Sequence, residues 1–295
     1  MKKITVIGAG TMGNGIAHVF AQSGFNVQLF DISEAALERA LVTIGKNMDR
    51  QIAKERMSEG DKKAALDRLH TGTNLAKSVS HADLIVEAAT ENKEIKFNLF
   101  KQLDELAPAH CILSSNTSSI SITKIAAQTS RPDKVIGMHF MNPVPVMKLV
   151  EIIRGYSTSN ETMNAVVEMS TSLGKVPVAC NDYSGFVANR ILMPMINEAI
   201  ISLHEGVAGV HEIDTIMKLG MAHPMGPLQL ADFIGLDVCL SIMNVLYEGL
   251  GNTKYAPCPL LINMVAAGKL GVKSSEGFYD YSSGVKNATV SNQFN

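Results

Sequence analysis

The chain has 295 residues, of which 46% are apolar and 18% charged, and its formal net charge at pH 7 is −2. This composition is typical of a globular protein and excludes an intrinsically disordered chain, while the charge gives no reason to expect binding to nucleic acid or to a membrane surface. The length favours two domains. The four cysteines are far apart and form no C-x-x-C motif, which argues against a zinc site or disulfide framework and favours the reducing cytoplasm.

Short apolar runs alternate with longer amphipathic segments in the first half of the chain. Strands are predicted at residues 4–7, 27–30, 83–88, 111–114 and 135–140, and helices at 12–23 and 93–106. This alternation predicts βαβ units that build a parallel sheet with right-handed crossovers. Residues 34–68 carry no strand signal. They predict a long helix over about 34–57, a turn at 59–61 and a second short helix, which together form a helical-hairpin insertion.

The character of the sequence changes near residues 183–185, after which it is mainly helical. We therefore predict an N-terminal α/β domain over 1–184 and an all-α domain over 185–295. The segment 191–203 is apolar on nearly every face, which predicts a helix buried all round, either as a core helix or at a subunit interface. The polar tail from residue 282 to 295 is expected to be loose. No apolar stretch approaches the ~18 residues of a membrane span, and the N-terminal apolar run is broken by glycine, so we expect neither a span nor a signal peptide.

The first motif with chemical meaning is a glycine-rich loop at the end of the first predicted strand. Its residues are Gly8, Ala9, Gly10, Thr11, Met12 and Gly13. Glycines at these positions permit a tight turn, the approach of a pyrophosphate to the backbone, and close packing of helix on strand. Asp31 ends the next predicted strand, where a carboxylate accepts hydrogen bonds from ribose hydroxyls and repels a 2′-phosphate. The motif predicts a Rossmann-type domain that binds NAD in preference to NADP.

A second group of residues predicts general acid–base chemistry. His139 ends one predicted strand, and Glu151 lies in the next apolar run, after a short loop that contains prolines. Such a loop can return the chain so that the two side chains meet. A carboxylate beside an imidazole fixes its tautomer and stabilises the imidazolium that forms when the ring takes a proton. By itself a buried histidine with a nearby glutamate is as well explained by a satisfied pair in the core.

Over 4–281 the sequence resembles the L-3-hydroxyacyl-CoA dehydrogenase family, including its bacterial 3-hydroxybutyryl-CoA members. The motifs that carry the resemblance are the glycine loop, the His139–Lys148 stretch, and the segments 115–119 (SNTSS), 185–190 (GFVANR), 224–227 (PMGP) and 276–279 (EGFY). The resemblance implies an NAD-dependent enzyme and a homodimer formed through the helical domain. It implies no metal.

The resemblance also implies roles for individual residues. His139 corresponds to the catalytic base, Glu151 to its orienting partner, and Ser118 and Asn189 to residues that position the substrate. Ser118 also lies near the nicotinamide, and Asn142 contacts the nicotinamide half of the cofactor. Further cofactor-side positions are Glu91, Lys96 and Lys273. Without the family, Ser118 reads equally well as a helix cap and the two lysines as ordinary surface charges.

The predicted insertion helix carries a basic stripe. Lys46, Arg50 and Lys54 are spaced i, i+4, i+8, so they share one face if the helix is continuous. Such a stripe is either a solvated face or a site for the phosphates of coenzyme A. The resemblance implies that Lys54 and Asn47 contact the coenzyme, with Asn47 standing where relatives have serine. Ser275 is a second departure, since relatives often have glycine there.

The sequence therefore predicts oxidation of a short-chain (S)-3-hydroxyacyl-CoA by NAD, or the reverse reduction, with an acyl-CoA thioester as partner. Two alternatives remain open. One is a related dehydrogenase that acts on a free hydroxy acid or sugar acid, and the other is a non-catalytic NAD-binding protein that reuses the fold.

Overall fold

An eight-stranded sheet organises the first part of the computed structural model, which describes residues 1–294. The sheet lies in the first of two units, Met1–Tyr183, and the second unit begins at Ser184. The strand order is β3-β2-β1-β4-β5-β6-β7-β8. The strands are β1 Lys3–Ile7, β2 Asn26–Phe30, β3 Leu69–Gly72, β4 Leu84–Glu87, β5 Ile112–Ser115, β6 Val135–Phe140, β7 Leu149–Arg154 and β8 Val176–Asn181.

The parallel sheet predicted for five strands is confirmed for β1, β2, β4, β5 and β6, but the whole eight-stranded sheet is mixed. β1 to β6 pair in parallel with their neighbours, whereas β6 and β7 are antiparallel and β8 then pairs in parallel with β7. The reason is the short connection between β6 and β7, because a parallel pair needs a crossover of a dozen or more residues. The five strands predicted from the sequence are confirmed, and β3, β7 and β8 are additional.

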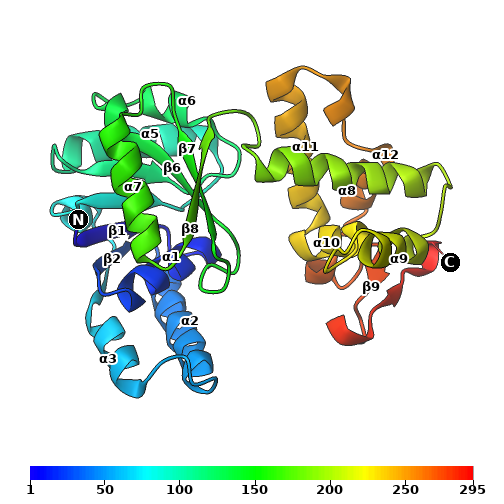
Figure 1. Cartoon of the computed structure of the whole chain (residues 1–295), viewed down its shortest axis with the longest axis horizontal. Helices are drawn as coiled ribbons and strands as arrows, with labels where there is room; N and C mark the ends of the chain where they lie inside the picture. Colours follow the sequence, from blue (N-terminus) through cyan, green and yellow to red (C-terminus); the bar gives the residue numbers. More distant parts are fainter. Residues whose placement is uncertain (295) are drawn as a thin grey trace. The chain divides into compact units, whose positions relative to one another are not determined.

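Seven α-helices belong to the first unit, and α7 lies across one face of β6, β7 and β8 (Figure 1). The helices are α1 Thr11–Gln22, α2 Glu34–Ile52, α3 Glu59–Asp67, α4 Leu75–Val79, α5 Lys93–Leu106, α6 Ile122–Ala126 and α7 Asn160–Ser172. Figure 1 also shows α2 and α3 extending away from the sheet as a pair, which confirms the predicted helical-hairpin insertion.

The boundaries inside this insertion differ from the prediction. α2 ends at Ile52 instead of near 57, and the predicted turn at 59–61 is the first turn of α3. Ser58 explains the difference, because it forms a capping box with Asp61. Its hydroxyl accepts the Asp61 N–H at 3.1 Å, and the Asp61 carboxylate accepts the Ser58 N–H at 3.1 Å. Glu55 has a φ of +56°, a left-handed conformation that interrupts the helix before this cap.

A buried histidine joins α1 to α2. His18 is 0% exposed, and its Nε2 lies 3.0 Å from Oε1 of Gln22 and 3.1 Å from Nε2 of Gln51. Its pKa is lowered from 6.5 to about 4, mainly by burial and to a smaller extent by the nearby ammonium of Lys175, against the opposing effect of the hydrogen bond to Gln22. The folded protein therefore holds this ring neutral at pH values where the unfolded chain protonates it.

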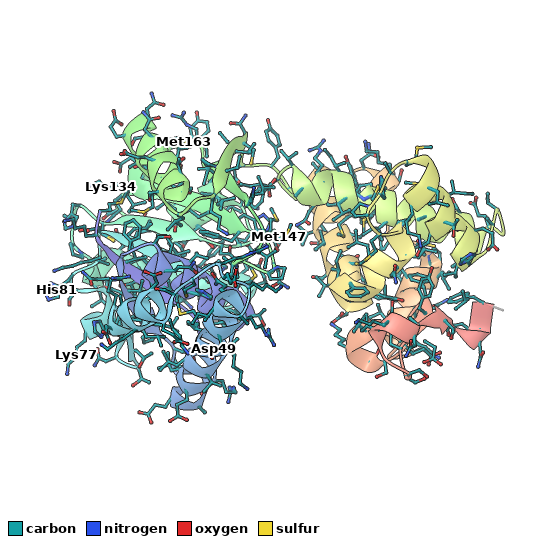
Figure 2. All side chains as sticks on the ribbon, turned by 60° about the horizontal axis from the view of Figure 1, so that its bottom comes forward. Asp49, Lys77, His81, Lys134, Met147 and Met163 are labelled. Carbon is teal, nitrogen blue, oxygen red and sulfur yellow. The ribbon has the colours of Figure 1, made fainter. Side chains whose placement is uncertain are left out.

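This difference predicts acid sensitivity between pH 6.5 and 4. Above pH 6.5 the His18 ring is neutral in both the folded and the unfolded state. Between pH 6.5 and 4 the unfolded state binds a proton at His18 and the folded state does not. The free energy of unfolding is therefore about 2 kcal/mol lower at pH 5 than at pH 7. Denaturant unfolding of His18→Gln at pH 7 and pH 5 is expected to lack this component. The exposed His81, labelled in Figure 2, supplies the control, because His81→Gln is expected to keep the acid sensitivity of the wild type. An unchanged pH dependence in His18→Gln would refute the assignment.

The second unit is mainly helical. Its helices are α8 Ala188–His204, α9 Val210–Gly220, α10 Pro227–Ile234, α11 Leu236–Leu250 and α12 Pro259–Ala266. Of the two alternatives for 191–203, the core helix buried all round is wrong, because Ile191 is 67% exposed in the single chain, whereas Met193, Ile196 and Ile200 are buried; the subunit interface stays a prediction. These buried positions follow helical spacing, so α8 turns one apolar face to the core of this unit and leaves another uncovered.

The C-terminal segment is ordered as far as the structure describes it, so the prediction of a loose tail is wrong for 282–294, and residue 295 lies outside the described residues. The strands β9 Tyr279–Asp280 and β10 Thr289–Val290 form an antiparallel pair. The buried carboxylate of Asp232 accepts hydrogen bonds from the main-chain N–H groups of Phe278 and Tyr279 at 3.0 and 2.9 Å. Phe294 stacks on Phe278 with ring centroids 5.7 Å apart.

Within residues 1–294, no single helix combines the length and hydropathy that a membrane span requires. α10 and α11 meet these criteria only together, and they are bent by 98° relative to one another.

Candidate active site

The glycine loop connects β1 to α1 and leaves the helix N-terminus open. Gly8 has a φ of +99°, and a Cβ there would lie 2.6 Å from the carbonyl oxygen of Ala88. A Cβ on Gly13 would lie 1.7 Å from the carbonyl oxygen of Gly8, so helix and loop pack too closely for any other residue. Gly10 has no atom within 4 Å of the place where a Cβ would stand. This open position beside the unpaired N–H groups of α1 fits a pyrophosphate.

Asp31 lies at the end of β2 and is tied to the same loop. Its Oδ2 accepts the Ala9 N–H at 2.7 Å and its Oδ1 accepts the Ser33 N–H at 2.9 Å. An ionised carboxylate has about four acceptor positions, so two are left for the hydroxyls of a ribose. The strand order from β3 to β6 is that of a dinucleotide-binding domain, and β1 and β2 stand at the positions where such domains place the glycine loop and this carboxylate.

Sequence reasoning missed Arg39 as a candidate at this site. A hollow beside the glycine loop is lined by Gly10 and Thr11 and, from α2, by Arg39 and Thr43. Arg39 is exposed, and its cation faces the same space as the loop that fits a pyrophosphate. The available signal was its spacing, because Arg39 and Thr43 are separated by one turn of α2 and therefore share a face.

The structure brings His139 and Glu151 together. β6 and β7 are antiparallel, and the two residues stand directly opposite each other in the register. Nδ1 of His139 lies 2.7 Å from Oε2 of Glu151, and the residues are 8% and 3% exposed. A carboxylate can only accept, so Nδ1 carries the proton of this bond and Nε2 is the basic nitrogen of the ring. The pair has the geometry of a general base with its orienting carboxylate.

Glu91 and Ser118, two residues far apart in the sequence, form a second polar contact. Oε1 of Glu91 accepts the main-chain N–H of Ser118 at 2.7 Å and its hydroxyl at 2.9 Å. Oε2 of Glu91 accepts the hydroxyl of Thr117 at 2.8 Å. The loops after β4 and β5 carry these residues, so the contact lies at the carboxyl ends of neighbouring parallel strands, where open α/β sheets bind ligands.

Lys96 is buried beneath the site and does not lie on the surface. It is 2% exposed, and its ammonium forms an ion pair with Glu87, which is 0% exposed. Its Nζ also lies 3.4 Å from the Ser115 hydroxyl and 3.9 Å from Oε2 of Glu91. The surface-charge interpretation of Lys96 is therefore wrong, and its contact with the site runs through Glu91.

Other predicted residues lie on separate elements. Asn142 is exposed in the loop between β6 and β7, and Asn189 stands in the first turn of α8 in the second unit. Lys273 forms an ion pair with Asp237 of the second unit. Ser275 follows with a φ of +64°, a left-handed conformation that explains why glycine suits this position.

The basic stripe does not continue along one helix over its whole length, because α2 ends before Lys54. Lys46 and Arg50 lie on α2, but Lys54 follows the end of the helix and is exposed in the turn. The carboxamide oxygen of Asn47 accepts from the Arg50 guanidinium at 3.2 Å. Asp49, labelled on α2 in Figure 2, pairs with Lys62 of α3, so this acidic residue is neutralised from the other helix of the insertion.

Two family models match consecutive parts of the chain. The NAD-binding domain of 3-hydroxyacyl-CoA dehydrogenase matches residues 3–183, and the C-terminal domain of 3-hydroxyacyl-CoA dehydrogenase matches residues 185–281. The 3-hydroxybutyryl-CoA dehydrogenase of Bradyrhizobium diazoefficiens is 52% identical over 281 residues, which cover 95% of this chain and 96% of that protein. The mitochondrial hydroxyacyl-coenzyme A dehydrogenase of Homo sapiens is 44% identical over 288 residues, which cover 95% and 91%.

A solved structure agrees over the same extent. The (S)-3-hydroxybutyryl-CoA dehydrogenase of Ralstonia eutropha is 51% identical, has a TM-score of 0.93, and is matched over 96% of this chain and 99% of that one. The strand order, glycine loop and Asp31 define an NAD-binding domain of the α/β dehydrogenase class. The chain belongs to the 3-hydroxyacyl-CoA dehydrogenase family.

Proposed function

We propose that this protein oxidises a short-chain (S)-3-hydroxyacyl-CoA with NAD, or reduces the corresponding 3-ketoacyl-CoA, with 3-hydroxybutyryl-CoA and acetoacetyl-CoA as the natural pair. The observation that carries the proposal is the buried contact of 2.7 Å between His139 and Glu151 in a chain with an NAD-binding domain. Support for the substrate comes from the names of full-length relatives at 51–52% identity.

In this mechanism His139 is the general base. The glycine loop and Asp31 would hold NAD, which would supply the acceptor for the hydride that leaves C3 of the substrate. Nε2 of His139 takes the proton of the 3-hydroxyl as the C3–O bond becomes a carbonyl, and it returns that proton in the reverse direction. Glu151 accepts the Nδ1–H throughout and stabilises the imidazolium. General acid–base catalysis of this kind contributes about 10²–10⁴ in rate.

Positioning of the reactants is assigned to polar side chains around the dyad. Ser118 hydrogen-bonds the 3-oxygen and lies near the nicotinamide, Asn189 positions the substrate, and Asn142 contacts the nicotinamide half of the cofactor. Glu91 holds Ser118 through both its main-chain N–H and its hydroxyl, which supports a cofactor-side role for this carboxylate. Lys273 completes the proposed cofactor contacts. Orientation of reacting groups can contribute several kcal/mol to the barrier.

The two units take different tasks in this proposal. Residues 1–184 bind NAD, and 185–295 contribute to the substrate site and to a homodimer. The apolar side chains that the second unit leaves exposed support the dimer, and they include Ile191, Ile216, Leu219 and Met221. Sedimentation at micromolar concentration is expected to give the mass of a dimer, and a stable monomer would contradict it. Four free cysteines support a cytoplasmic location.

Coenzyme A is assigned to the basic stripe of the insertion. Lys46, Arg50 and Lys54 supply cations, while Asn47 keeps hydrogen-bonding capacity where relatives have serine. Asp49 stands next to Arg50 in the sequence, but its negative charge is paired with Lys62. It therefore offsets the positive charge of the stripe less than an unpaired carboxylate would. Phosphates bind such a surface in a salt-dependent manner.

The test compares a thioester with a free acid. NADH oxidation is measured with acetoacetyl-CoA, longer 3-ketoacyl-CoAs and free acetoacetate, each with NADH and NADPH. The proposal predicts turnover of the thioester with NADH, and an increased KM for acetoacetyl-CoA with little change in kcat for Lys54→Ala. The control is Lys77→Ala. Lys77, labelled in Figure 2, lies on α4, outside the insertion formed by α2 and α3, so this variant is expected to keep the wild-type KM. Equal turnover of free acetoacetate would favour a hydroxy-acid dehydrogenase, and NADH binding without any turnover would favour a non-catalytic protein.

A further inference from the structure

Lys175 is a buried cation to which the proposed reaction gives no role. It lies between α7 and β8 and is 8% exposed. Its ammonium donates to two main-chain oxygens, those of Val144 at 2.5 Å and Met147 at 2.7 Å. Burial lowers its pKa, and no carboxylate of residues 1–294 forms an ion pair with it. An ammonium removed from water is costly unless its hydrogen bonds are made, so these two carbonyl groups must stay in place.

Both carbonyl groups belong to the loop 141–148, which joins β6 to β7. This loop begins two residues after His139 and ends three residues before Glu151. It is a compact turn, because the carbonyl oxygen of Pro143 accepts the N–H groups of Val146 and Met147 at 2.9 and 3.0 Å. Met147, labelled in Figure 2, lies on this loop. Whatever fixes the turn also fixes the position of Asn142 at its start.

The opposite side of the loop packs on α1. Val144 is 2% exposed, and a Cβ built on Gly15 would lie 2.9 Å from its Cβ. No real Cβ atom tolerates that separation, so the absence of a side chain at Gly15 lets the loop approach the helix that begins at the glycine loop. The loop 141–148 thus contacts α1 on one side and the ammonium of Lys175, the residue that precedes β8, on the other.

We propose that Lys175 is a positioning residue that holds the loop 141–148 so that Asn142 reaches the nicotinamide half of the bound cofactor. The inference rests on the contact proposed above for Asn142. It assigns to Lys175 no contact with substrate or cofactor, since the buried ammonium donates two hydrogen bonds to the loop.

Comparing two ligands isolates this role. ADP-ribose contains the adenosine and pyrophosphate parts of NADH but lacks the nicotinamide. Lys175→Met keeps the apolar stem and removes the donors, so its affinity for NADH is expected to fall about tenfold or more, because hydrogen bonds to a charged group are lost. Its affinity for ADP-ribose is expected to stay at the wild-type value. A merely structural role would lower both affinities together, and equal losses would overturn the proposal.

Two further variants keep the test decisive. Lys175→Arg can still donate to two carbonyl oxygens and is expected to recover part of the NADH affinity. If Lys175→Met does not fold, Gly15→Ala moves the same loop from the other side, through the contact with Val144, and is expected to lower NADH affinity alone. Wild-type NADH affinity in Gly15→Ala would then contradict the proposal.

A double-mutant cycle separates this inference from the function on which it rests. Asn142→Ala is expected to lower NADH affinity selectively, and Lys175→Met in that background is expected to add little, because both act through one side chain. Additive losses would mean that Lys175 acts independently of Asn142. Wild-type NADH affinity in Asn142→Ala would instead remove the proposed contact of Asn142, whatever Lys175→Met does.

Discussion

Replacing His139 with glutamine is expected to lower kcat for acetoacetyl-CoA by about 10²–10⁴-fold, the usual contribution of a general acid or base, while the affinity for NADH stays at the wild-type value. The reason is local. Glutamine keeps the volume and a hydrogen-bonding group toward Glu151, but it has no nitrogen that can take and return a proton near neutral pH. Stopped-flow or steady-state NADH oxidation measures kcat, and fluorescence titration measures the NADH affinity.

The matched control is a second histidine–carboxylate pair outside the site. Nε2 of His110 lies 3.2 Å from Oδ1 of Asp83, and the His110 side chain is 67% exposed. His110→Gln removes an imidazole from a carboxylate as His139→Gln does, yet it is expected to keep the wild-type kcat. Turnover by His139→Gln within a few-fold of the wild type would refute the assigned base.

Lys96→Met is expected to destabilise the protein by about 3–5 kcal/mol, because it leaves the carboxylate of Glu87 buried without its cation. Both side chains are almost wholly removed from water, and Glu87 otherwise accepts only the Ser115 hydroxyl at 2.6 Å and the Ala89 N–H at 2.9 Å among the bonds of the described residues. Denaturant unfolding measures this loss of stability, and the dependence of the unfolding free energy on denaturant concentration is expected to stay unchanged.

A double variant shows whether the uncompensated charge is the cause. Lys96→Met combined with Glu87→Gln removes both charges and keeps a carboxamide oxygen for Ser115, so most of the lost stability is expected to return. The exposed pair of Lys63 and Asp67 supplies the control, and Lys63→Met is expected to change stability little. A double variant no more stable than Lys96→Met would show that the buried charge is not the cause.

The contact between His139 and Glu151 is predictable because it depends on local sequence. One strand ends at His139, a short loop with prolines follows, and the next apolar run contains Glu151, so a tight reversal brings the two into register. The glycine loop is predictable for a similar reason, since its conformational needs are met only by glycine at fixed positions.

The environment of Lys96 and Lys175 could not be predicted in this way. Each lysine stands in a sequence that resembles a solvated surface, and its burial depends on contacts between different elements, with Glu87 on β4 for the first and with the loop 141–148 for the second. β8 was missed for another reason. It lies at the edge of the sheet, contains Pro177 and exposes Val176 and Val178, so it lacks the pattern of a buried strand.

The most direct test of the proposed chemistry follows the hydride. NADH that carries deuterium at the transferable position of its nicotinamide ring is mixed with acetoacetyl-CoA and the wild-type protein, and the product is analysed by mass spectrometry and NMR. The account predicts (S)-3-hydroxybutyryl-CoA with the deuterium at C3, formed in proportion to the NADH consumed. Reduction without deuterium at C3, or no reduction by folded protein that binds NADH, would contradict it.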